Sequence, residues 1–384
     1  MTISPPPEEH RTVSRPIAVL CILLAVSSAL FAQSAPAPDE AAIKQIVDGI
    51  MLPYIQQDNP PGAIVGVSLH GHRYFFPYGK ARDDGMPFAP DTLVEIGSCT
   101  KTFTTTLFAL AIGRKQMDPN ASAQNYMPEG YTLTKPAQAM TPLELADFTS
   151  GLPDDPPHLP PRLAMRSIEH YTTRDFLTWL SRWRPESSLP APFLYSNAGI
   201  GVLGYLIEKA TATTWEQQLE REILQTLTMP DTTLRPTPEQ MKRMARGHTP
   251  NGSDAPPWPI FAWYAAGGLR STAQDMISFG EANLGHSEVN GKPVPPELTA
   301  AMKLAQTPIY TLPRPINKQA MAWVNNVGNG DPNIKPVILK DGGTAGFGTT
   351  IAISPTKDAA VFIGINQSRS QTTPKAVEIM RRLP

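Results

Sequence analysis

With 384 residues, 41% of them hydrophobic, the chain is long enough to bury a sizeable core in one or two domains. Its formal net charge is −1 and it contains no basic run, which argues against nucleic acid as a partner. This composition fits a globular enzyme.

Residues 1–35 are predicted to be a secretory signal peptide. Arg11 and Arg15 precede an apolar run over residues 17–31, and small residues follow around 32–37. The run is too short for a comfortable transmembrane span, so we expect no stable membrane span after cleavage. The segment predicts a periplasmic or secreted protein.

A helix and a β-hairpin are predicted next. Apolar residues recur at helical spacing over residues 39–57, while residues 63–69 and 73–78 indicate two strands joined through His70-Gly71-His72. Nothing beside these histidines could complete a metal site, and the chain has neither an H-E-x-x-H nor a paired-cysteine pattern. We therefore predict no metal and no cofactor.

The segment Ser98-Cys99-Thr100-Lys101 opens a predicted helix, because apolar residues follow it at helical spacing and no proline occurs before Pro119. Residues three apart on a helix are surface neighbours, so Lys101 can reach the Ser98 hydroxyl as a base. The positive end of the helix dipole also favours an alkoxide and disfavours a protonated lysine. A serine N-cap followed by a solvated lysine is the alternative that this motif alone leaves open.

A second S-x-x-K occurs at residues 354–357. A chain of this length should contain roughly one such motif by chance. This copy lies between two apolar runs of β type, which predicts a hairpin connection.

Cys99 follows Ser98 directly and invites a cysteine-nucleophile interpretation. Adjacent helix residues point about 100° apart, so we predict a buried thiol instead. Because Cys21 lies in the signal segment, no intramolecular disulfide can form after cleavage.

Two further motifs are Tyr195-Ser196-Asn197 and Lys340-Asp341-Gly342. The patterns Y-x-N and K-x-G that they represent each occur once in the chain. A phenol is a poor base at neutral pH, but two nearby ammonium groups, from Lys101 and Lys340, would favour its phenolate. Alternatively, Tyr195 is a core residue and Lys340 a charge at a strand end. The joint occurrence of all three motifs favours an active-site serine acyl hydrolase.

The arrangement of the predicted elements indicates an α+β fold. Residues 98–247 are mainly helices and proline-rich loops, residues 335–365 hold two more strands, and residues 374–383 form a closing helix. The strands then form one antiparallel sheet flanked by helices, with an inserted mainly helical region. We predict a sheet domain from residues 39–97 plus 248–384 and an active site at its junction with the helical region.

In these motifs the chain resembles the penicillin-recognising serine hydrolases, particularly class C β-lactamases and low-molecular-mass penicillin-binding proteins. Residues 148–153 also resemble the family's H-T-S-G-L-P segment, and residues 266–276 resemble its G-G-x-x-S-T-x-x-D-M segment. The resemblance implies a β-lactamase/transpeptidase-like fold and an acyl-Ser98 intermediate formed on β-lactams or D-amino-acid cell-wall peptides.

The resemblance also implies individual roles. Ser98 would be the acylated nucleophile, and Lys101 and Tyr195 would share general-base and general-acid work. The residues implied to bind or orient the substrate are Asn197, Lys340, Asp341 and Gly342. The backbone N–H groups of Ser98 and Gly343 would form the oxyanion hole.

Asp341 departs from the family pattern, which usually has Thr or Ser between the lysine and the glycine. An acid beside an anion-binding site weakens it, unless the acid turns away to pair with a cation. A carboxylesterase using the same serine, and a penicillin- or peptidoglycan-binding protein with little turnover, therefore stay open.

Two other enzyme classes are disfavoured. The chain lacks the G-x-S-x-G elbow of an α/β-hydrolase. It also lacks the ligand pattern of a zinc-dependent β-lactamase. We expect a monomer that acts on a small-molecule or peptidoglycan-peptide substrate.

Overall fold

The computed structural model describes residues 38–384 except 59, 158–167, 169, 314–316 and 332. The predicted signal peptide lies outside the described residues. Within the described ranges, no helix combines the length and the apolar character that crossing a membrane requires. Residues 37–384 group into one unit, so the boundaries proposed at residues 98 and 247 stay a prediction.

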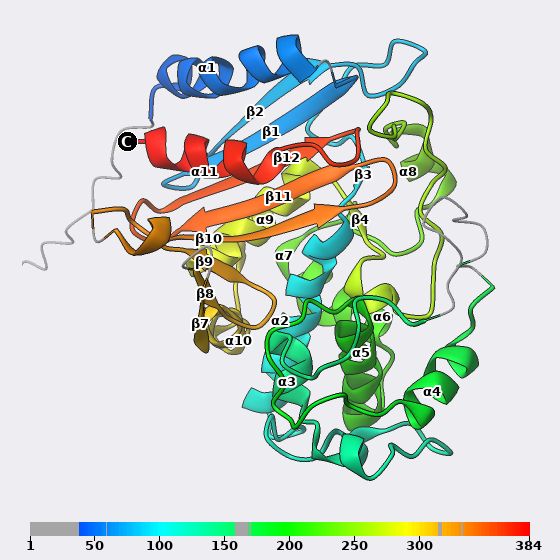
Figure 1. Cartoon of the computed structure of the whole chain (residues 1–384). Coiled ribbons are helices and arrows are strands. Elements are labelled where there is room, and N and C mark those ends of the chain that lie inside the picture. Colours follow the sequence, from blue (N-terminus) through cyan, green and yellow to red (C-terminus); the bar gives the residue numbers. More distant parts are fainter. Residues whose placement is uncertain (1–37, 59, 158–167, 169, 314–316, 332) are drawn as a thin grey trace, which may run out of the picture. The chain divides into compact units, whose positions relative to one another are not determined.

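An eight-stranded antiparallel sheet organises the described chain (Figure 1), with the strand order β2-β1-β12-β11-β10-β9-β8-β7. The strands are β1 (Gly62–Leu69), β2 (His72–Gly79), β7 (Tyr310–Leu312), β8 (Asn317–Gln319), β9 (Val324–Asn326), β10 (Val337–Gly343), β11 (Gly348–Ser354) and β12 (Ala359–Ile365). Two small ribbons pair β3 (Val94–Glu95) with β4 (Arg270–Ser271) and β5 (Glu288–Val289) with β6 (Lys292–Pro293).

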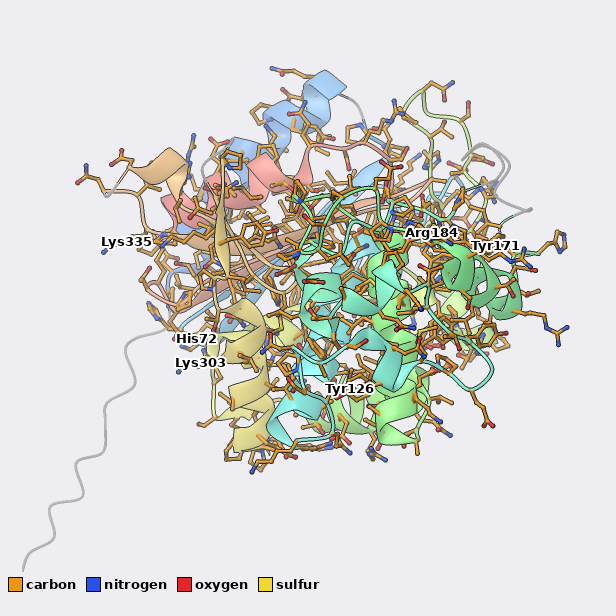
Figure 2. All side chains as sticks on the ribbon, turned by 60° about the horizontal axis from the view of Figure 1, so that its bottom comes forward. His72, Tyr126, Tyr171, Arg184, Lys303 and Lys335 are labelled. Carbon is orange, nitrogen blue, oxygen red and sulfur yellow. The ribbon has the colours of Figure 1, made fainter. Side chains whose placement is uncertain are left out.

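The predicted hairpin is confirmed to within one residue at each strand end. Its two-residue turn places both His70 (φ 53°) and Gly71 (φ 79°) in the left-handed region, the conformation that matches the twist of antiparallel strands. His72, at the start of β2, lies at the periphery in Figure 2. The second S-x-x-K is confirmed as the connection from β11 to β12.

Helices cover both faces of the sheet. The longer ones are α1 (Glu40–Asp58), α2 (Thr100–Gly113), α4 (Thr173–Arg182), α5 (Asn197–Thr211), α9 (Ala273–Leu284), α10 (Pro296–Gln306) and α11 (Thr372–Arg382). The shorter ones are α3 (Pro142–Asp147), α6 (Trp215–Gln218), α7 (Gln225–Leu227) and α8 (Pro238–Lys242). The helices predicted at residues 39–57 and 374–383 are confirmed as α1 and α11.

Two apolar clusters form the core. Apolar residues of α1 and α11, among them Val47 and Met380, pack with Val65 of β1 on one face of the sheet. On the other face Phe279 of α9 packs with Phe362 of β12, in a cluster that continues into α2 and α5. Figure 1 shows α2 to α6 gathered on this second side. The predicted α+β fold, a sheet flanked by helices with a mainly helical region inserted, is confirmed.

The prediction of two more strands over residues 335–365 was wrong, because three strands, β10 to β12, occupy that range. Three short strands that the sequence did not indicate, β7 to β9, extend the sheet beyond β10. Each has three residues, too few for an alternating pattern to be recognised. The second half of β10 is Lys-Asp-Gly-Gly, a poor strand sequence that pairing with β11 keeps extended.

Candidate active site

The three motifs lie on three different elements. Ser98 lies in the 3₁₀ turn Gly97–Cys99, which leads directly into α2. Tyr195 precedes α5, whose N-cap Ser196 accepts a hydrogen bond from the Gly199 N–H at 2.7 Å. The third motif lies on β10, with Lys340 and Gly342 two residues apart and therefore on the same face of the strand.

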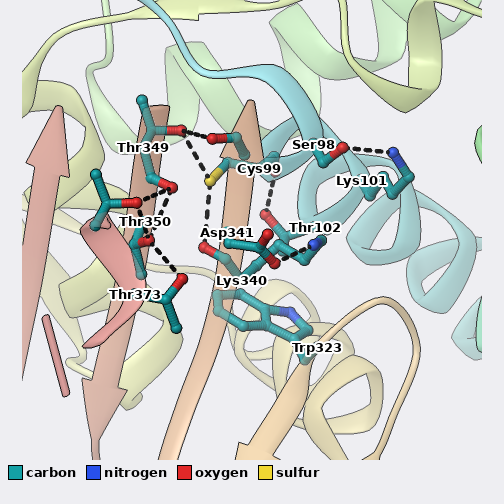
Figure 3. Close-up of polar contacts among 12 residues, drawn as sticks. Ser98, Cys99, Lys101, Thr102, Trp323, Lys340, Asp341, Thr349, Thr350 and Thr373 are labelled. Carbon is teal, nitrogen blue, oxygen red and sulfur yellow. Dashed lines mark hydrogen bonds and ion pairs between the residues drawn. The ribbon is translucent and has the colours of Figure 1, made fainter. Parts of the chain in front are cut away.

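Lys101 and Ser98 are in direct contact, as the helical spacing predicted. Lys101 Nζ lies 2.9 Å from Ser98 Oγ (Figure 3). It also donates to Asn197 Oδ1 at 2.6 Å and to the Ala266 carbonyl oxygen at 2.7 Å. The lysine is fully buried. Burial lowers the pKa of Lys101, and the positive charge of Lys340 lowers it further, while Tyr195 and Asp154 act in the opposite direction.

These contacts define what a neutral Lys101 can do. A neutral amine has two N–H groups and one lone pair. The carbonyl oxygen of Ala266 can only accept, and so can Asn197 Oδ1, because the Asn197 amide nitrogen donates to Asp154 at 2.9 Å and to Asp155 at 3.2 Å. With both N–H groups directed to these acceptors, the lone pair is left for the Ser98 hydroxyl. The arrangement suits general-base catalysis.

Two threonines of α2 bring the Ala266 carbonyl into place. Thr104 Oγ1 donates to the Ala265 carbonyl oxygen at 2.6 Å, and Thr100 Oγ1 accepts from the Leu269 N–H at 3.2 Å. Both residues are buried. These two hydrogen bonds hold residues 265–269 against the face of α2 that carries Lys101.

Tyr195 lies between two amines. Its ring centroid is 4.9 Å from Lys101 Nζ and 5.2 Å from Lys340 Nζ. The ring packs against Phe148 with a centroid separation of 4.8 Å, and the Leu194 N–H donates to the Phe148 carbonyl oxygen at 2.9 Å. The predicted meeting of a phenol with two lysines around the serine turn is therefore present.

Lys340 forms an ion pair with its neighbour Asp341, with 2.8 Å between Nζ and Oδ1 (Figure 3). The lysine side chain is 4% exposed and the aspartate side chain 62%. Burial opposes the charge on Lys340, but Asp341 and Tyr195 outweigh it and raise the lysine pKa above its ordinary value. Lys340 in turn lowers the pKa of Asp341. Both groups are therefore charged at neutral pH, and Asp341 turns toward a cation.

Glycines let β10 approach the serine turn. A Cβ on Gly342 would lie 2.0 Å from the Ile96 carbonyl oxygen, and one on Gly97 (φ 49°) would lie 2.7 Å from the backbone nitrogen of Gly343. The backbone of Gly343 therefore lies close to that of Gly97, the residue before Ser98, and the oxyanion hole of Ser98 and Gly343 stays a prediction. The pairing of β10 with β9 ends at Leu339, before the motif begins.

Cys99 is buried, and its Sγ lies 3.3 Å from the Lys340 carbonyl oxygen. Burial raises the pKa of the Cys99 thiol to about 11. The predicted buried thiol is therefore confirmed, and the group is a thiol rather than a thiolate at neutral pH.

Sequence reasoning missed the groups that orient Asn197 and Lys101. Asp154 and Asp155 directly follow the FTSGLP segment, and Ala266 opens the segment AGGLRSTAQDM. Their place beside two recognised segments is the only signal the sequence carried. Asp154 and Ala266 act through contacts with α5 and α2, and no local spacing rule predicts those contacts.

Comparisons with known proteins agree with this geometry. A family model described as Beta-lactamase matches residues 41–381. The chain is 28% identical over 376 residues to a β-lactamase of Escherichia coli (strain K12), covering 91% of this chain and 94% of that one. It is 27% identical over 353 residues to a β-lactamase of Pseudomonas fluorescens, covering 85% and 94%.

Solved structures share the fold over nearly the whole described chain. A class C β-lactamase superposes with a TM-score of 0.79 at 25% identity, covering 91% of this chain and 99% of that one. A D-alanine carboxypeptidase from Burkholderia cenocepacia superposes with a TM-score of 0.74 at 26% identity, covering 90% and 100%. The chain is therefore a serine hydrolase with the β-lactamase/transpeptidase-like fold, and it belongs to the Beta-lactamase family.

Proposed function

We propose that this enzyme hydrolyses β-lactams or D-amino-acid cell-wall peptides through an acyl-Ser98 intermediate. The observation that carries the proposal is the environment of Lys101, whose Nζ lies 2.9 Å from Ser98 Oγ while two oxygen acceptors occupy its other hydrogen-bonding directions. The substrate class is supported by the similar structures, a class C β-lactamase and a D-alanine carboxypeptidase.

In the acylation step, neutral Lys101 accepts the proton of the Ser98 hydroxyl as Oγ attacks the substrate carbonyl carbon. The carbonyl oxygen becomes an oxyanion and accepts hydrogen bonds from the N–H groups of Ser98 and Gly343. When the tetrahedral intermediate collapses, the leaving nitrogen takes a proton from Tyr195. Asn197 holds Lys101 in place through Oδ1, and its amide nitrogen donates to Asp154 and Asp155 rather than to the substrate that the sequence predicted.

In the deacylation step, Tyr195 accepts a proton from a water molecule, which then attacks the acyl carbon. The bond to Ser98 Oγ breaks, and the serine recovers its proton from Lys101. The ammonium group of Lys340, 5.2 Å from the Tyr195 ring, stabilises negative charge on the phenol during this step.

A carboxylesterase is the second candidate, and the ion pair between Lys340 and Asp341 favours it. Asp341 partly offsets the positive charge of Lys340, so Lys340 attracts a substrate carboxylate less strongly. β-Lactams and D-Ala-D-Ala peptides carry such a carboxylate, whereas simple esters lack one. A protein that acylates once and hardly turns over is the third candidate.

Three substrates under the same conditions distinguish these candidates: nitrocefin, a D-Ala-D-Ala peptide and a short-chain nitrophenyl ester. Steady-state rates are combined with intact-mass detection of an acyl adduct. Turnover of nitrocefin or the peptide supports the proposal, turnover of the ester alone supports the esterase, and a stoichiometric adduct without product release marks the third candidate.

The variant Ser98→Ala should lose both turnover and adduct. Ser354→Ala, the same change in the other S-x-x-K, is the matched control because Ser354 ends β11 at the hairpin to β12. It should keep both. An acyl adduct that survives in the Ser98→Ala protein would defeat the assignment of the nucleophile.

We also propose that the protein is exported to the periplasm, or secreted, after cleavage of residues 1–35, and that it acts there on the cell wall as a monomer. Cell fractionation and amino-terminal sequencing of the mature protein test the export. Light scattering tests the oligomeric state. A protein found in the cytosol with its first residues intact would contradict the proposed location.

A further inference from the structure

A second cluster of ionisable side chains lies outside the active-site motifs. It joins His248, Asp83 and Asp254, whose ligand atoms all lie within 4.8 Å of one another. His248 Nε2 is 3.4 Å from Asp83 Oδ1 and 3.9 Å from Asp254 Oδ1. We propose that this cluster is a zinc site.

The histidine is held in the tautomer that a metal needs. Its Nδ1 lies 3.0 Å from the Asn366 carbonyl oxygen, an atom that can only accept, so Nδ1 carries the proton. In the neutral ring Nε2 then has a lone pair and no proton, and it faces two carboxylate oxygens. A histidine whose second nitrogen donates to a backbone carbonyl is the usual outer-shell arrangement of a metal ligand.

The burial of the three side chains also fits a metal site. His248 is 4% exposed, so its ring is fixed, whereas the side chains of Asp83 and Asp254 are 66% and 53% exposed. The carboxylates leave the outer side of the cluster open to water. Zinc would then have three protein ligands, and a water molecule in the open position would be its fourth ligand.

The distances match tetrahedral zinc. Zn–N and Zn–O bonds of about 2.0–2.2 Å place tetrahedral ligand atoms about 3.3–3.5 Å apart. The two distances from His248 Nε2 to the carboxylate oxygens, 3.4 and 3.9 Å, are within about half an ångström of that separation between ligand atoms. Calcium and magnesium prefer six or more oxygen ligands, so the nitrogen and the small number of protein ligands favour zinc.

The neighbouring cations do not cancel the negative charge of the two carboxylates. Arg246 pairs with Asp254 through Oδ2, the oxygen that does not face His248. Arg82 pairs with Asp84 rather than with Asp83. Two carboxylates and one guanidinium therefore surround the imidazole of His248.

A bound zinc ion would tie together two segments that are distant in sequence, the loop after β2 and the turn from His248 to Asp254, and His248 in turn contacts Asn366 just after β12. The His248 N–H also donates to the Gly346 carbonyl oxygen at 3.1 Å, in the turn that joins β10 to β11. The ion would therefore stabilise the turn that follows the Lys340-Asp341-Gly342 motif without taking part in the chemistry at Ser98.

Calorimetric titration of tag-free protein with Zn²⁺, Ca²⁺ and Mg²⁺ tests the site, together with thermal unfolding in zinc and in EDTA. We expect one Zn²⁺ per chain, no comparable binding of Ca²⁺ or Mg²⁺, and an unfolding midpoint raised by roughly 3–6 °C at 100 times the dissociation constant. The absence of zinc binding, or equal affinity for Ca²⁺, would overturn the proposal.

Matched variants locate the ion. Asp83→Asn should weaken zinc binding at least about tenfold, whereas Asp84→Asn, the same change in the adjacent exposed aspartate, should not. His248→Gln should abolish binding, and His286→Gln, which breaks a different histidine–aspartate pair, should leave it intact. If His248→Gln fails to fold, the two aspartate variants still decide, because both carboxylates are exposed. Equal zinc affinity in the two aspartate variants would overturn the assignment.

Discussion

Replacing Asp341 tests whether its carboxylate limits the substrates that the enzyme accepts. Asp341→Asn keeps the shape of the side chain and removes its charge, and Asp341→Thr also supplies the hydroxyl that the family usually has. Both changes break the ion pair and release Lys340 to bind a substrate carboxylate. We expect kcat/KM to rise for carboxylate-bearing substrates and to stay unchanged for neutral esters.

The magnitude follows from the geometry of Lys340. Asp341 Oδ1 lies 2.8 Å from Nζ. A substrate oxygen at the same distance along another tetrahedral N–H direction would lie about 4.6 Å from Oδ1. Two unit charges at that separation repel by roughly 0.9 kcal/mol in bulk water and roughly 3.6 kcal/mol at an effective dielectric constant of 20. Because the Asp341 side chain is 62% exposed, the aqueous end applies, and the gain in kcat/KM should be about five- to tenfold.

The assay compares kcat/KM for nitrocefin with kcat/KM for a neutral nitrophenyl ester in each variant. Asp358→Asn, which neutralises a half-buried aspartate that pairs with His286 at the turn between β11 and β12, is the control for a general change in net charge. The gain should shrink with added salt, because exposed charges are screened. The depressed pKa of Asp341 keeps it ionised through neutral pH, so the ratio should not change between pH 6 and 8.

An unchanged ratio of the two kcat/KM values in Asp341→Asn would refute the reasoning, since it would mean that this carboxylate does not face the substrate. An equal gain in Asp358→Asn would show that only net charge matters. A gain in Asp341→Thr without one in Asp341→Asn would assign the effect to the hydroxyl instead of the charge.

Lys101→Met and Tyr195→Phe should each lower kcat/KM at least about 100-fold, as the loss of a base does, and a wild-type rate in either protein would remove that residue from the mechanism. Because the base must be neutral, wild-type kcat/KM should fall as the pH drops through the pKa of Lys101, which burial lowers from the ordinary lysine value of 10.5; an acid limb centred at or above 10.5 would contradict this. Gly342→Ala should destabilise the fold by about 1–3 kcal/mol in denaturant unfolding, because its Cβ would lie 2.0 Å from the Ile96 carbonyl oxygen. Gly113→Ala, with nothing within 4 Å of its Cβ, should not, and equal unfolding of the two would contradict the close approach of β10.

The contacts and elements that could be predicted are those made by residues close together in sequence. The contact of Ser98 with Lys101 follows from helix geometry, since residues three apart lie on one face. The hairpin of β1 and β2 follows from two apolar runs around His70-Gly71, residues that tolerate positive φ. The α+β fold follows from the order of such elements along the chain.

Only the tertiary structure decided the contacts between distant segments. Tyr195 meets both lysines because α5 packs against α2 and β10 packs against the serine turn Gly97–Cys99, and Asn197 is oriented by Asp154 and Asp155 from another loop. The strands β7 to β9 have three residues each, too few for a pattern to show, and only their pairing beside β10 identifies them as strands. His248 and Asp83 are 165 positions apart, so no spacing motif could reveal their cluster. Backbone geometry sets distances within a turn of helix or a hairpin, whereas distances between remote segments depend on how the whole core packs.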